Sequence, residues 1–211
     1  MKSKNKTDST FKVYWSAYGG PEAILRSKFF AIAILLTAIS YPLWLLNDYS
    51  DFPTSILPDI LGFSIGAFAV WLGFGSEDFK EVITRIETKH GNGYDVSNAS
   101  FLHLIIVQTT TLIYSIAFKA IIENETIQKI SITVASKSEA TLYLILTFDF
   151  IFRFIGFLLF SYSLTLIIAV GMNIFRITTW HRKYLLHRAI KRKQNQKQNG
   201  IHQRASPSND D

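Results

Sequence analysis

The fold class of this chain follows from residues 55–76, SILPDILGFSIGAFAVWLGFGS. This stretch has no charged side chain between Asp59 and Glu77, and its apolar part, residues 56–74, is 19 residues long. An α-helix of that length measures about 28 Å, close to the ~30 Å of a bilayer's hydrocarbon core. The stretch therefore predicts a membrane-spanning helix.

One side of this predicted helix consists of small residues. At about 100° per residue, four positions share a narrow sector of the helical wheel; they are Gly62, Gly66, Ala69 and Gly73. Small residues let another helix backbone approach closely, which is the main route to tight helix packing in lipid. The pattern predicts either a groove that receives a helix of the same chain, or a seam between subunits or a pore-facing surface.

The rest of the chain repeats this arrangement. Of its 211 residues 48% are hydrophobic, gathered into four long runs with the charges almost wholly between them. We therefore expect an all-α integral membrane four-helix bundle with spans over 29–46, 56–74, 101–122 and 154–175. These spans form a transmembrane domain of 29–175, which lies between a basic N-terminal segment, 1–28, and a basic tail, 176–211, disordered from residue 194 onward.

Local signals predict where the spans begin and end. Pro42 is expected to kink the last turn of the first span, and Pro58 lies in the first turn of the second. Ser97 or Asn98 is the expected cap of the third span, and the alternation at residues 130–134 predicts a short extended segment. Residues 140–175 are apolar without a turn signal and too long for one crossing, so we expect one long helix that extends beyond the lipid.

The basic residues predict the orientation. Six Lys and Arg precede the first span, three lie in the link after the second and nine follow the fourth, whereas the other two links hold only Lys129 and Lys137. The positive-inside rule then places both termini and the link after the second span in the cytoplasm. The fourth helix is expected to extend into the cytoplasm as well.

The link after the second span contains a candidate docking surface. Residues 77–89 predict an amphipathic helix capped by Ser76, with apolar residues at helical spacing. We expect a soluble partner to dock on Phe79, Lys80, Ile83, Arg85 and Lys89. The alternative is that the apolar residues rest on the chain's own tail or on lipid headgroups.

Polar groups inside the spans have two interpretations. Gln108, Thr111 and Ser115 share one side of the third span, where they either hold helices together by hydrogen bonds or line a polar conduit. Asp149 and Arg153 are four residues apart, and form either a self-neutralising pair near the interface or an intramembrane functional site.

Both ends of the chain carry membrane-contact signals. Aromatic residues near the N-terminus predict interfacial anchoring, with packing on a cytosolic partner as the alternative; they are Phe11, Tyr14, Trp15 and Tyr18. In the tail, anionic lipid headgroups are the expected ligands, with nucleic acid as the alternative, for Arg188, Lys191, Arg192 and Lys193.

Signals for catalysis are missing from the sequence. The chain has no cysteine, Walker loop, GxSxG or HExxH motif, and its five histidines, among them His103 and His181, are scattered. We expect a protein that is not an enzyme and that holds no cofactor and no metal.

Residues 57–75, LPDILGFSIGAFAVWLGFG, together with four spans and basic ends, resemble the KwaA-like membrane subunit of the bacterial Kiwa anti-phage defence system. The resemblance implies a homo-oligomeric inner-membrane sensor, with a tetramer as one arrangement, that responds to phage attack at the envelope. It also implies a cytosolic DNA-binding defence subunit as partner, and we expect no direct nucleic-acid binding by this chain. The alternative function is a small channel or transport protein with a polar path along spans two and three.

Overall fold

The computed structural model describes residues 9–45, 49–73, 76–136 and 138–205. Within these ranges the chain is helical apart from one short hairpin, as the all-α prediction requires. The elements in order are α1 (Thr10–Tyr18), α2 (Gly20–Leu25), α3 (Lys28–Ile39), α4 (Tyr41–Leu45), α5 (Asp51–Gly73), α6 (Glu77–Thr84), β1 (Glu87–Thr88), β2 (Gly91–Asn92), α7 (Gly93–Ile122), α8 (Glu125–Ala135) and α9 (Glu139–Ala205).

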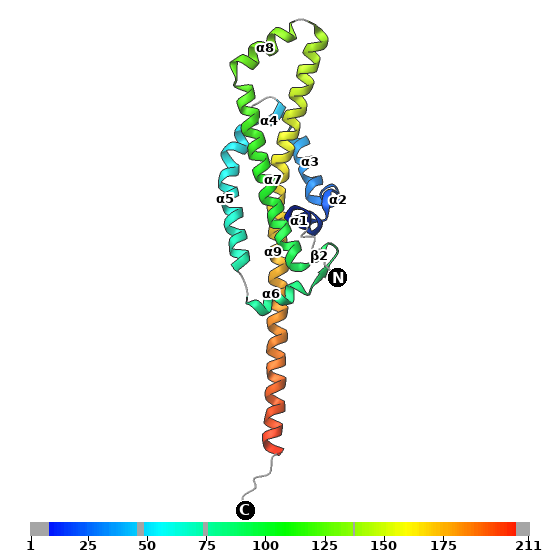
Figure 1. Ribbon diagram of the computed structural model, residues 1–211, viewed down its shortest axis with the longest axis vertical. Helices are drawn as coiled ribbons and strands as arrows, with labels where there is room; N and C mark the ends of the chain where they lie inside the picture. The colour runs from blue at the N-terminus through cyan, green and yellow to red at the C-terminus, as the bar shows by residue number, and fades with distance from the viewer. Residues whose placement is uncertain (1–8, 46–48, 74–75, 137, 206–211) are drawn as a thin grey trace, which may run out of the picture.

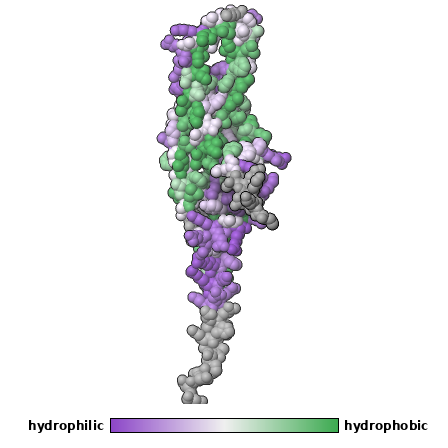
Figure 2. Space-filling model, viewed as in Figure 1, coloured by the Kyte–Doolittle hydropathy of each residue, from purple (hydrophilic) through white to green (hydrophobic). Residues whose placement is uncertain are grey.

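Helix α9 is the axis of the molecule (Figure 1). Helices α3 and α7 pack along it, α5 packs on α7, and α8 joins the upper ends of α7 and α9. The lower part of α9 extends away from the other helices. Figure 2 shows that hydrophobic side chains cover the upper part of the molecule and hydrophilic side chains cover the described part of this extension.

Among the described residues, three helices are long and apolar enough to cross a membrane, namely α5, α7 and α9. Helix α3 is apolar but has only 12 residues, about 18 Å of helix. The span expected over 29–46 is divided into two helices next to the kink expected at Pro42, because α3 ends at Ile39 and α4 starts at Tyr41. Pro42 has no N–H for the preceding turn, and the indole of Trp44 donates to the Thr37 carbonyl there at 2.8 Å.

The second span also starts elsewhere than expected. Helix α5 begins at Asp51, so Pro58 lies inside it rather than in its first turn. Pro53 occupies the first turn instead, where its missing N–H costs no hydrogen bond.

The cap of the third span is Asn92, not Ser97 or Asn98. Its side chain accepts a hydrogen bond from the Asp95 backbone N–H at 2.8 Å, so α7 has 30 residues. Ser97 is buried inside the helix, and Asn98 accepts the indole N–H of Trp71 from α5 at 2.7 Å. The early cap extends α7 well below its apolar stretch.

Two further local expectations are wrong. Residues 130–134 belong to helix α8 rather than to an extended segment, since the Asn124 side chain caps that helix by accepting from the N–H groups of Thr126 and Ile127. The helix expected over 77–89 ends at Thr84, and β1 and β2 follow as an antiparallel hairpin. Gly91 takes a φ of +140° in that hairpin, a value that L side chains rarely adopt.

The expectation of one long final helix is confirmed, since α9 runs for 67 residues without a break. The expected start of disorder at residue 194 is wrong because the helix continues to Ala205. Residues 206–211 lie outside the described ranges.

Candidate functional site

The small-residue side of α5 lies on the outside of the chain. Gly62, Gly66, Ala69 and Gly73 are all exposed, and a Cβ atom placed on any of the three glycines would meet nothing within 4 Å. Within the described residues, no helix of the same chain lies in this small-residue groove, and that interpretation is wrong for this part of the chain. The seam between subunits stays a prediction.

Helix α5 packs through its opposite side. Leu57, Ser64 and Trp71 recur every seven residues and are buried, and the ring of Phe68 stacks on Phe101 of α7 with centroids 5.5 Å apart. Asp59, three residues before Gly62, is exposed. The open face thus combines small residues with a carboxylate.

Below α5, helix α6 is attached to the extension of α9. Phe79 is 1% exposed and its ring centroid lies 4.4 Å from that of His181 and 6.3 Å from that of Tyr184. Asp78 pairs with Arg188 at 3.4 Å. We refer to these contacts as the α6–α9 joint.

The α6–α9 joint covers the apolar part of the expected docking surface. Phe79 and Ile83 are buried, so neither can contact a soluble partner unless α6 moves. The structure agrees with the alternative, in which these apolar residues pack on the chain's own tail. The reason is that α9 continues as a helix beyond its apolar part and offers aromatic side chains to α6.

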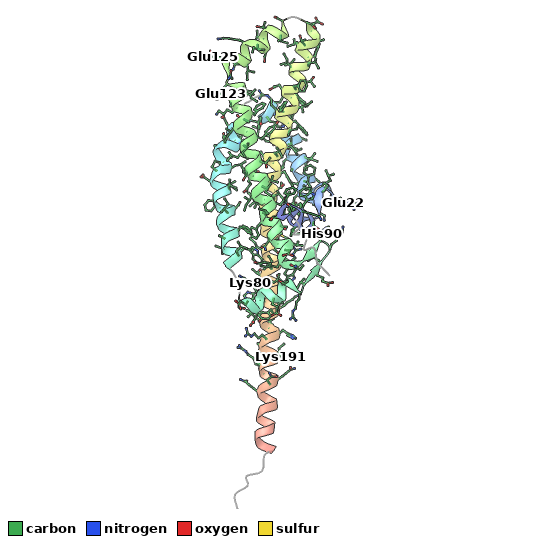
Figure 3. The ribbon with its side chains drawn as sticks, in the orientation of Figure 1. Glu22, Lys80, His90, Glu123, Glu125 and Lys191 are labelled. Carbon is green, nitrogen blue, oxygen red and sulfur yellow. The ribbon has the colours of Figure 1, made fainter. Side chains whose placement is uncertain are left out.

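The charged residues of the same link remain at the surface. Lys80 donates its Nζ to the Leu72 carbonyl near the end of α5 at 2.8 Å, and Arg85 pairs with Glu81. Lys89 is exposed in the hairpin. Figure 3 shows Lys80 near the foot of the helical body and Lys191 below it on the extension.

A cluster of three tyrosines and one histidine, buried except for the half-buried Tyr18, joins α1 to α7 and α9. The Tyr14 hydroxyl lies 2.8 Å from His103 Nδ1, and the Tyr162 hydroxyl lies 3.1 Å from His103 Nε2 and 3.3 Å from the Tyr18 hydroxyl. The Tyr18 ring stacks on the imidazole with centroids 3.8 Å apart. The aromatic residues expected to anchor at the interface, or to pack on a cytosolic partner, therefore include two that bind this chain's own core.

The protonation of the cluster follows from its burial. Burial, with a smaller contribution from Tyr18, raises the pKa of the Tyr14 phenol to about 12, and burial likewise raises the pKa of the Tyr18 phenol. Both phenols are therefore protonated at neutral pH, and each ring nitrogen of His103 has one phenol hydroxyl within hydrogen-bond distance. The four-residue spacing of Tyr14 and Tyr18 is the only sequence signal for this cluster.

Asp149 and Arg153 form the ion pair that their spacing predicts. Arg153 Nε lies 2.7 Å from Asp149 Oδ2, and the Arg153 side chain is 17% exposed. Its guanidinium carbon lies 5.7 Å from the centroid of Phe118. The functional role of the pair stays a prediction.

The polar side of α7 is sealed between helices. Gln108, Thr111 and Ser115 are completely buried. The expected hydrogen bonds across helices are not found for them in the described part of the chain, since Thr111 donates to its own helix at the Val107 carbonyl and the other two side chains have no partner.

The four basic residues expected to bind lipid headgroups lie on the extension of α9. Three of them, Lys191, Arg192 and Lys193, are exposed, and the fourth, Arg188, pairs with Asp78 in the α6–α9 joint. Within the described ranges, no three His, Asp or Glu side chains are grouped so that they could hold a metal ion. Comparison of the chain with known protein families, curated proteins and solved structures gave no match.

Proposed function

We propose that this chain is an oligomeric sensor and anchor subunit of a bacterial inner membrane, which passes an envelope perturbation to a cytosolic DNA-binding partner of a Kiwa-like anti-phage system. The observation that carries the proposal is the arrangement of α5. One side of this helix is open and small, and its lower end is linked to the cytosolic extension through α6.

The open side of α5 supports assembly with further copies. Small residues permit close helix packing in lipid, and the Cβ positions of Gly62, Gly66 and Gly73 are unobstructed. A carboxylate that faces lipid is costly, and Asp59 is exposed near the same side. Packing this face against a second copy shields the carboxylate from lipid.

The α6–α9 joint supports transmission of a signal. Lys80 contacts the lower end of α5, Phe79 contacts α9, and Asp78 pairs with Arg188. A displacement of α5 at the subunit seam therefore reaches the extension through one short helix. The partner is expected to bind the exposed residues of the link, Arg85 and Lys89, whereas the basic residues of the extension are expected to bind anionic lipid headgroups.

The proposed topology has four crossings with both termini in the cytoplasm. Helices α3 and α4 together provide the first crossing, since both pack on α9. The hydrophilic residues of the extension lie at one end of the hydrophobic surface (Figure 2). The extension and the 77–100 link hold most of the Lys and Arg residues that follow the first span, which supports the cytoplasmic assignment of that end.

The experiment that tests the proposal compares Gly66→Leu with Ala67→Leu. Both positions are exposed on α5, but only Gly66 lies on the small face. The proposal expects Gly66→Leu to reduce the oligomer in lipid nanodiscs and to weaken recovery of a DNA-binding protein from native membranes. Equal oligomer size and equal recovery for wild type and both variants would refute it.

Asp59 supports a channel as the second candidate. If the small faces line a pore, the carboxylates form a ring at its wall, an arrangement used by cation channels. Asp59→Asn then abolishes cation flux into liposomes. A sensor without a pore shows no flux in either form.

A further inference from the structure

An apolar cavity lies between α7, α8 and α9. Its volume is about 550 Å³, within the roughly 300–1,000 Å³ of small-molecule sites. The upper end of α7, the lower side of α8 and one side of α9 supply its walls. Most of these side chains are hydrophobic, and they include Phe118, Ile122, Ile127, Ile132, Ile145 and Phe152.

The cavity opens to an apolar surface. Ile121, Ile132 and Phe152 line it and are also exposed. The same surface continues along α9 through Leu144 and Leu146, both more than half exposed. Helices α7 and α9 are long and apolar enough to cross a membrane, and the exposed large hydrophobic side chains of α9 begin at Leu142, before the crossing expected over 154–175. We therefore place lipid chains next to this opening.

The open apolar walls favour an apolar ligand, because side chains without contact atoms lose dispersion energy that such a ligand restores. Water is a poor filler because it needs two to four polar partners. Three of the four polar side chains in the wall are already engaged, since Gln128 donates to the Ile122 carbonyl at 2.7 Å and Arg153 pairs with Asp149.

We propose that this cavity binds one acyl chain of a membrane phospholipid. The acyl chain enters between Ile121 and Ile132 and lies against the side of α9 that carries Ile145. The wall holds one acid and one base that neutralise each other, so the site does not select a charged headgroup. This distinguishes it from the basic extension, which favours anionic lipid.

Photocrosslinking of the full chain tests the proposal. The protein is placed in nanodiscs with phosphatidylcholine or phosphatidylglycerol that carries a diazirine in its acyl chain, and the cross-linked peptides are mapped by mass spectrometry. We expect crosslinks within residues 118–132 and 145–153, with equal yield for the two headgroups.

Filling the cavity provides the matched comparison. Ile145→Trp places a ring in the cavity, whereas Leu144→Trp places the same ring on the exposed surface. The yield should fall about tenfold in Ile145→Trp, because each methylene kept out loses favourable burial, and should be unchanged in Leu144→Trp. Ser131→Trp fills the cavity from α8 and should act like Ile145→Trp, with Ile130→Trp as its exposed control.

The outcomes are distinct. Equal yields in the filled and control variants overturn the proposal, as does a yield that depends on the anionic headgroup. If Ile145→Trp does not fold, the Ser131→Trp and Ile130→Trp pair gives the same decision from the other wall.

Discussion

Replacing Phe79 with alanine should release α6 from α9. The ring is 1% exposed and lies against His181 and Tyr184, and truncating a buried phenylalanine costs about 3–5 kcal/mol. Helix α6 has only eight residues and is too short to be stable alone, so the loss appears as local opening. A loss of about 3 kcal/mol raises the opening equilibrium roughly 150-fold.

The ion pair in the same joint is expected to contribute less to its stability than the Phe79 ring. Asp78 and Arg188 are 3.4 Å apart with side chains 59% and 46% exposed. An exposed pair contributes roughly 0–1 kcal/mol, so Asp78→Asn should raise the opening equilibrium at most about fivefold. The ring, not the charge pair, is therefore expected to hold the joint.

Hydrogen exchange of the α6 amides in nanodiscs measures this opening. The matched control is Phe11→Ala, which truncates a phenylalanine 65% exposed on α1 and should leave α6 protected. Protection of α6 in Phe79→Ala equal to that of the wild type would refute the reasoning. A larger loss in Asp78→Asn than in Phe79→Ala would also contradict it.

Three further predictions concern other parts of the chain. Tyr14→Phe keeps the ring but removes the hydrogen bond to His103, and should lower the free energy of unfolding in detergent by about 1 kcal/mol; an unchanged thermal midpoint would contradict this. Neutralising the three exposed basic residues of the extension, Lys191, Arg192 and Lys193, should weaken its contact with anionic nanodiscs by about 1 kcal/mol per charge, and a fluorophore on the extension should report a smaller effect at high salt. Reporter fusions after Glu125 and Lys89 should show periplasmic and cytoplasmic locations respectively, and the reverse pattern would overturn the topology.

Some features of this protein could be read from local sequence rules. The apolar stretches of α5, α7 and α9 mark them as candidate spans because unpaired charges are costly in hydrocarbon. Ser76 caps α6 as predicted, since its side chain accepts from the Phe79 N–H, and the Asp149–Arg153 pair follows from four-residue spacing on one helix. In each case the interacting groups are close in sequence.

Other boundaries were missed because two local signals competed. The alternation at residues 130–134 favours a strand, but the Asn124 cap starts a helix through them. Ser97 and Asn98 have the residue types of a cap, but Asn92 starts α7 five residues earlier than Ser97. A residue type permits a cap at several positions, and the backbone path into the helix selects one.

Contacts between segments distant in sequence determine which side of each helix is buried and which is exposed. Periodicity identifies the small face of α5 but cannot say whether it is covered, which depends on Trp71 and Phe68 packing on α7 through the opposite side. The same holds for Phe79, whose apolar side meets α9 instead of a partner. Tyr14 and His103 are 89 residues apart, and His103 and Tyr162 are 59 residues apart. Helical spacing acts over three or four residues, so only the packing of whole helices brings such groups together.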